Sequence, residues 1–144
     1  MYLLDTNIVS ELRKGLKADQ HVKDWASKTP SNQMFVSVIS VLELEQGVLL
    51  KEHKDAVQGA VLRAWLQLHV LPAFAERILP VTLDIAQTCA RLHVPDPRSD
   101  RDAMIGATAM VHGMTLVTRN LQDFRRMNGI SLLNPWDWPF EEPR

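Results

Sequence analysis

The sequence lacks the features of secreted and membrane proteins. It has a single cysteine, Cys89, among 144 residues, which excludes an internal disulfide framework and fits a reducing compartment. No apolar run approaches the ~20 residues that a membrane-spanning helix needs. The amino terminus lacks the basic segment, apolar run and small-residue cleavage site of a signal peptide. We therefore expect a cytoplasmic protein that makes no membrane contact.

The chain also lacks an excess of charge of one sign. It carries 16 Lys and Arg against 17 Asp and Glu, for a net charge of −1 and a pI near 6.5. Nucleic-acid-binding domains are usually basic, so this balance does not indicate one. It does not exclude one either, because a carboxylate metal site lowers the net charge of a nuclease. The length predicts one domain over residues 1–144.

Short apolar runs alternate with segments of helical periodicity. Residues 2–4 form an apolar run that stops at Asp5, which predicts a buried strand of a parallel sheet. Further strands are expected over 34–36, 78–80, 115–118 and 130–133. Helices are expected over 8–14, 19–30, 37–49, 55–74, 82–92, 101–112 and 121–127, with a polar break over 51–54. This order predicts an α/β domain: a short parallel sheet of about five strands with helices on both faces.

Four polar residues follow or face the predicted strand ends. They are Asp5 after the first strand, Glu43 in the helix after the second, Asp102 at the start of the helix before the fourth, and Asn120 after the fourth. Ligands of open α/β sheets bind at the carboxyl ends of the strands, where Asp5, Glu43 and Asn120 are expected to converge. We expect Asp102 to join them only if its helix crosses the sheet unusually or begins a turn away from its predicted start.

Carboxylates brought together repel one another, which raises their pKa values unless a cation neutralises them. Mg²⁺ and Mn²⁺ suit such oxygen ligands, and the chemistry they support includes phosphodiester hydrolysis. The residues alone leave open a second interpretation, in which these carboxylates are helix caps and solvated surface groups.

Five motifs match a known family in order. They are the segments 3–12 (LLDTNIVSEL), 37–47, 102–109, 117–124 and 134–136. Together they resemble those of PIN-domain ribonucleases, especially the VapC/FitB-type toxins of bacterial toxin–antitoxin modules. The resemblance covers the chain from Met1 to about Trp138.

The resemblance implies a site and an activity. Asp5, Glu43 and Asp102 would hold Mg²⁺, with Mn²⁺ as a substitute, and Asn120 would complete the catalytic set. The activity would be hydrolysis of RNA by a water that the ion activates, and the partners would be RNA, a cognate antitoxin and a second copy in a homodimer. Many relatives have aspartate where this chain has Asn120, so we expect one firmly held ion.

Two other functions are considered: a phosphatase and a binding module. A phosphatase with Asp5 as nucleophile needs a second aspartate two residues on, where this chain has Asn7. A catalytically weak or inactive PIN-like module that mainly pairs with a partner protein stays open.

Other side chains carry weaker expectations. Glu11 and Glu45 are expected at the surface, Asp123 is expected to cap the following turn, and Thr118 is open between a structural and a functional role. Trp136 and Trp138 are expected to pack the tail over the core. The arginines near the last motifs are candidates for phosphate contacts or ordinary solvated groups: Arg98, Arg101, Arg119, Arg125 and Arg126. The helix over 55–74 is apolar on most sides, which predicts either a partner contact or full burial.

Overall fold

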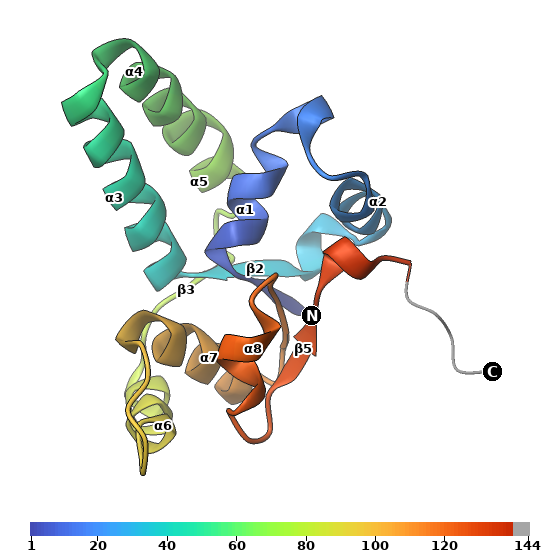
Figure 1. Ribbon diagram of the computed structural model, residues 1–144, viewed down its shortest axis with the longest axis vertical. Helices are drawn as coiled ribbons and strands as arrows, with labels where there is room; N and C mark the ends of the chain where they lie inside the picture. Colours follow the sequence, from blue (N-terminus) through green and yellow to red (C-terminus); the bar gives the residue numbers. More distant parts are fainter. Residues whose placement is uncertain (140–144) are drawn as a thin grey trace.

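The computed structural model describes residues 1–139 and confirms an α/β fold (Figure 1). The strands are β1 (Tyr2–Leu4), β2 (Met34–Ser37), β3 (Ile78–Leu79), β4 (Thr115–Val117) and β5 (Ser131–Leu133). The helices are α1 (Thr6–Leu12), α2 (Gln20–Lys28), α3 (Val38–Lys54), α4 (Ala56–Trp65), α5 (Leu71–Ala73), α6 (Leu83–Leu92), α7 (Asp100–His112) and α8 (Leu121–Arg125). Single 3₁₀ turns cover Gly15–Lys17, Ser31–Gln33 and Pro135–Asp137, and a π-helical segment covers Leu66–Val70.

The five strands form one parallel sheet in the order β3-β2-β1-β4-β5. The chain builds outward from β1 to β3 on one side, then crosses back to place β4 and β5 on the other. The order therefore reverses between β1 and β4. Loops leave the carboxyl ends of these two strands in opposite directions, which opens the crevice where α/β proteins bind ligands.

Both faces of the sheet are buried, as the continuous apolar runs predicted. Leu4 and Val117 face one hydrophobic cluster, which α1, α2, α3 and the π-helical segment complete. Leu3 and Leu116, one residue earlier in each strand, face a second cluster with residues of α7 and α8. Side chains of a strand alternate between the faces, so helices cover this sheet on both sides.

Side-chain caps fix where several helices begin. Asp19 caps α2, Ser37 caps α3 and Thr82 caps α6, each by accepting a backbone N–H of the first turn. Asp5, at the end of β1, caps α1 because its side chain accepts the Thr6 N–H. Asp5 is in extended conformation at the strand end, which is the backbone state that an N-cap requires.

The helices over residues 38–73 differ from the predicted pattern. α3 continues through the polar segment 51–54 and ends at Asp55, which caps α4 through the N–H groups of Val57 and Gln58. The polar break was wrong because lysine and glutamate are good helix formers on a solvated face. Full burial of the following helix is also wrong, since Val57, Val61 and Leu68 are 57–73% exposed.

No helix within residues 1–139 is long and apolar enough to span a bilayer.

Candidate functional site

Asp5 is a buried carboxylate at the carboxyl end of the central strand. It is 5% exposed, and its Oδ1 accepts the Thr6 N–H at 2.8 Å. Its Oδ2 accepts the Thr118 hydroxyl at 2.8 Å and the Asn7 amide at 3.3 Å. Among residues 1–139, no Lys, Arg or His nitrogen lies within 4.0 Å of this carboxylate. Burial raises the pKa of Asp5, although the Thr118 and Thr6 hydrogen bonds oppose the rise.

Glu43 approaches the same place from α3. Its Oε1 accepts the Thr6 hydroxyl at 2.8 Å, and its Oε2 lies 3.9 Å from the Arg101 guanidinium. Glu45, two residues on, points elsewhere: both of its oxygens bind the Arg63 guanidinium at 2.7–2.8 Å. Glu45 is thus partly exposed at the surface, as expected, and faces Arg63 of α4. A spacing of two residues separates side chains by about 200° around a helix, so only Glu43 faces the site.

Asp102 reaches the site without an unusual crossing of the sheet. α7 ends at Gly113, in left-handed conformation with φ +64°, and β4 begins at Thr115. A helix that ends beside the amino end of a strand begins near its carboxyl end, so the antiparallel direction places Asp102 there by default. The expectation that Asp102 would need an unusual crossing was wrong, because a helix that returns antiparallel to the strands begins at their carboxyl edge. The helix also begins at Asp100, within one residue of the prediction.

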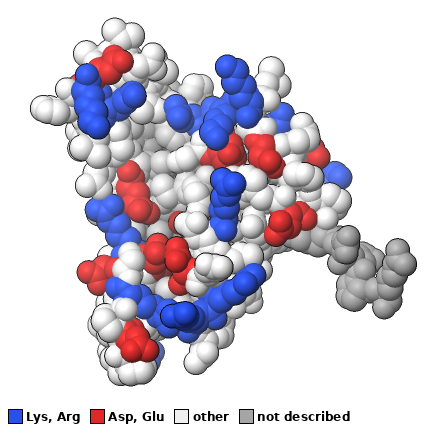
Figure 2. Space-filling model, viewed as in Figure 1, with Lys and Arg blue, Asp and Glu red and all other residues white. Residues whose placement is uncertain are grey.

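One hollow of about 490 Å³ joins the four predicted residues. Asp5, Glu43, Asp102 and Asn120 all line it. Figure 2 shows acidic side chains around the hollow of this face, interspersed with basic side chains, one of which lies near the middle of the view. Burial, and then the charges of Asp5, Asp123 and Glu43, raise the pKa of Asp102 to about 6. The carboxylates are therefore close enough to repel one another, as the sequence predicted.

The donor set fits a hard divalent cation by its chemistry. All the donors are oxygens, and a bound cation would offset both the burial of these charged groups and their repulsion, which together raise the pKa values. As the side chains stand, no three His, Cys, Asp or Glu groups within residues 1–139 are arranged to hold one ion. Glu43 is turned toward Thr6 and Arg101 instead. Ligation by all three carboxylates would therefore require Glu43 to exchange these partners for the ion.

Sequence reasoning missed much of the network that orients these carboxylates. Thr118 is fully buried, donates its hydroxyl to Asp5, and accepts the Asn120 N–H at 3.0 Å and the Asn7 amide at 3.3 Å. Thr118 thus ties the end of β4 to the end of β1. The sequence does show polar residues directly after these two strands. It does not show that Asp5 and Thr118, 113 positions apart, form a hydrogen bond.

Three further side chains lie at or near the site: Glu11, Asp123 and Trp136. Glu11, expected at the surface, is 8% exposed, lines the hollow and pairs with Lys14 at 3.0 Å. Asp123 does not begin α8, whose N-cap position is Asn120; its charge instead helps raise the pKa values of Asp5 and Asp102. Trp136 packs against the core as predicted, and also lines the hollow beneath the Arg119 guanidinium, 4.8 Å from the ring centre.

The raised pKa of Asp102 predicts a pH-dependent cost to stability. In chelator, we expect Asp102→Asn to stabilise the fold above about pH 7 by about 1 kcal/mol; a full shift would give ~3 kcal/mol, but this half-buried side chain is screened by solvent. A carboxylate whose pKa is raised on folding costs stability as pH rises from its unfolded value to its folded value. The advantage of the variant should therefore appear between about pH 4 and pH 6 in urea unfolding curves. If the variant is more stable than the wild type by the same amount at pH 4 as at pH 7, the raised pKa of Asp102 is not the cause.

Comparison with known proteins gives consistent matches over nearly the whole chain. A family profile described as PIN domain matches residues 2–130. The VapC ribonuclease Y4jK of Sinorhizobium fredii is 33% identical over 142 residues, covering 95% of this chain and 99% of that protein. The crystal structure of FitAcB from Neisseria gonorrhoeae superposes with a TM-score of 0.85 at 31% identity, covering 94% of this chain and 99% of the other. A toxin–antitoxin complex from Klebsiella pneumoniae superposes with a TM-score of 0.65 at 28% identity, covering 94% and 98%.

Proposed function

This chain belongs to the PIN-domain family, as its motifs predicted, and we propose that it is a metal-dependent endoribonuclease that acts as the toxin of a toxin–antitoxin module. One observation carries the proposal: Asp5, Glu43 and Asp102 line a single hollow at the carboxyl edge of the sheet, where burial and then the charges of neighbouring carboxylates raise the pKa values of Asp5 and Asp102. An RNA-cutting toxin of this kind would act in the cytoplasm.

The three carboxylates would hold Mg²⁺, or Mn²⁺ in its place. A bound divalent cation supplies charge neutralisation, Lewis-acid polarisation of a phosphodiester and activation of a water. The chain's own residues prepare the site: Thr118 and Asn7 orient the Asp5 carboxylate, and Thr6 holds Glu43 beside it until Glu43 would exchange this partner for the ion. The Asn120 side chain, at the same hollow, offers an uncharged donor and acceptor for water or substrate.

Basic residues at the rim suit an RNA backbone. Arg13, Lys14 and Arg119 line the hollow around the carboxylates. Cationic side chains bind nucleic acids mainly by neutralising phosphates. A rim of positive charge around an acidic floor would draw the strand in and leave the floor for the ion.

The proposed protein partners are a cognate antitoxin and a second copy of this chain. Similar folds are found in a toxin–antitoxin complex, and α3 and α4 expose apolar side chains that a monomer would leave in water. The most exposed of these on the two helices and the π-helical segment are Leu49, Leu50, Val57, Val61 and Leu68. This surface is the candidate contact for either partner.

The direct test is RNA cleavage by purified, antitoxin-free protein with Mn²⁺ and with chelator. We expect cleavage with Mn²⁺, none with chelator, and a loss of about tenfold or more in Glu43→Gln, since even second-shell changes cost metal sites 10–100-fold. Glu45→Gln is the matched control: it removes the same charge from α3 but faces Arg63, and an exposed pair contributes about 1 kcal/mol or less.

The outcomes separate the proposals. Cleavage that persists in chelator, or that is equally weak in both variants, would overturn the metal-site proposal. No cleavage by the wild type, with a partner protein still bound, would favour the inactive binding module.

A further inference from the structure

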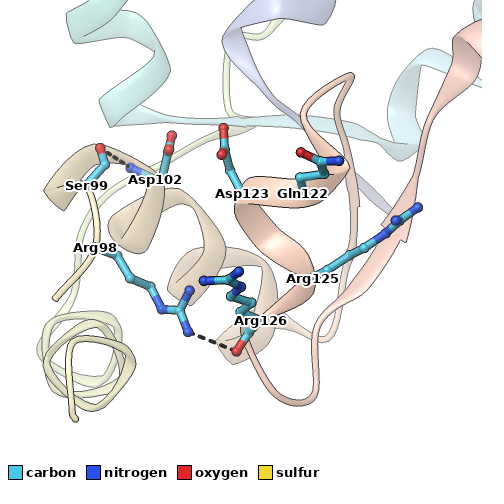
Figure 3. A pocket seen from close by; sticks show the side chains of 7 residues that line it. All are labelled: Arg98, Ser99, Asp102, Gln122, Asp123, Arg125 and Arg126. Carbon is cyan, nitrogen blue, oxygen red and sulfur yellow. Dashed lines mark hydrogen bonds between the residues drawn. The ribbon is translucent and has the colours of Figure 1, made fainter. Parts of the chain in front are cut away.

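A second hollow lies directly beside the carboxylate site. It measures about 680 Å³ and is lined by Arg98, Arg125 and Arg126, with Asp102 and Asp123 at its upper edge (Figure 3). Asp102 also lines the carboxylate hollow. The two hollows therefore meet at Asp102, and a ligand lying across that residue reaches both.

The three arginines of this hollow have no acidic partner. Among residues 1–139, no carboxylate lies within 4.0 Å of their guanidinium groups. Two arginines elsewhere in the described chain are engaged in ion pairs: Arg63 binds Glu45 and Glu52, and Arg101 lies beside Glu43. Unpaired guanidinium groups gathered in one cavity attract an anion, above all one that presents several oxygens.

Arg98 is fixed in place by backbone carbonyls, one of which belongs to Arg126. Its Nε donates to the Leu92 carbonyl at the end of α6, and its Nη2 donates to the Arg126 carbonyl at the end of α8, both at 2.9 Å. Its own N–H donates to His93 Nδ1 at 3.0 Å. The side chains of Arg98 and Arg126 come close together in the lower part of the hollow, and Arg125 extends from the other side of α8 (Figure 3). Arg98 is thus a scaffold, and the exposed Arg125 and Arg126 are free to contact a ligand.

We propose that this hollow is a subsite for a backbone phosphate of the RNA strand, next to the phosphodiester that lies at Asp102. The proposal rests on the proposed ribonuclease function. A nucleic acid carries a phosphate at every link, so one strand can place one phosphate at the carboxylate site and a neighbouring one among the arginines. An acidic peptide is the alternative occupant of the arginine hollow, and it lacks the regularly spaced second anionic group that would reach the carboxylate site.

This subsite reads the backbone rather than the bases. Guanidinium contacts to phosphate position a strand and carry no sequence information. The arginine hollow therefore sets how firmly RNA is held and on which side of the cut it extends, and leaves any sequence choice to other residues.

The test is the salt dependence of kcat/KM for single-stranded RNA in Mn²⁺, in the full chain. We expect Arg125→Gln/Arg126→Gln to raise KM several-fold and to reduce the slope of log kcat/KM against log salt by about 0.7, the contribution of one phosphate contact on a single strand. Arg126→Gln leaves the backbone carbonyl that anchors Arg98 in place, so melting curves should match the wild type. Lys54→Gln/Arg91→Gln removes the same charge from exposed positions outside both hollows and should leave the slope unchanged.

The failures are distinguishable. If the wild type cleaves RNA and both double variants share its slope, the subsite is wrong and the ribonuclease function stands. If the wild type cleaves no RNA, both proposals fall. If the slope is unchanged while an oligo-glutamate peptide binds the wild type and not the arginine variant, the hollow takes an acidic peptide and the proposal is overturned.

Discussion

Replacing Asp5 with asparagine is expected to lower RNA cleavage by about 100-fold or more while leaving the fold intact. Loss of second-shell partners costs metal sites 10–100-fold, and Asp5 is proposed as a direct ligand at the centre of the site. The substitution keeps an oxygen that can accept the Thr6 N–H, so the cap of α1 survives. It removes the charge that burial and neighbouring carboxylates make costly. Rates with Mn²⁺ and melting curves measured in parallel check both parts.

The matched control for Asp5→Asn is Asp19→Asn. Asp19 is also a helix N-cap, accepting the His21 and Val22 N–H groups at 2.9 and 3.2 Å, but it lies outside the carboxylate hollow. Asparagine is as good a cap as aspartate. Activity lost equally in both variants would indicate damage to the fold, and activity kept in Asp5→Asn would remove Asp5 from the site.

Gly59→Ala is expected to destabilise the protein by about 2 kcal/mol, against the usual trend for glycine in a helix. α4 crosses α3 so closely at Gly59 that a Cβ there would lie 2.4 Å from the Glu52 Cα and 2.7 Å from the Glu52 nitrogen. These are backbone atoms of a helix, so the two helices must separate, and overpacking of this kind costs about 1–3 kcal/mol. Separation would also pull Arg63 from Glu45 and Glu52. Urea unfolding measures the change.

Gly47→Ala, on the same pair of helices, is expected to change stability in the opposite direction. Gly47 lies within α3, and a Cβ there would meet nothing within 4 Å. Alanine is favoured over glycine in a helix by about 1 kcal/mol, so this variant should be more stable than the wild type. If both alanine variants stabilise the protein, the close crossing at Gly59 is not a constraint.

The local pattern of apolar and polar residues predicted most helices and strands, and it placed most of the candidate site residues near one edge of the sheet. The apolar run ending at Asp5 fixed a strand, and the position of Glu43 on the following helix and of Asn120 after the fourth strand placed both at one edge. What pattern missed depends on contacts between distant segments: Glu11 is buried by the hollow, and Glu45 meets Arg63 of another helix. The extent of α3 was missed for another reason, because polar residues on a solvated helix end look like a loop.

The crossing back from β3 to β4 has a consequence for a chain that is still being made. Asp5 and Glu43 belong to the first third of the sequence, whereas Asp102, Thr118 and Asn120 belong to the last. Domains are synthesised from the amino end, and β1 acquires its neighbour β4 only when nearly the whole chain is available. A nascent or truncated product that ends before α7 therefore contains two of the three site carboxylates and lacks the Thr118 hydroxyl that orients Asp5. The site is completed only by α7 and the end of β4, so its chemistry begins only after β4 has been made and has paired with β1.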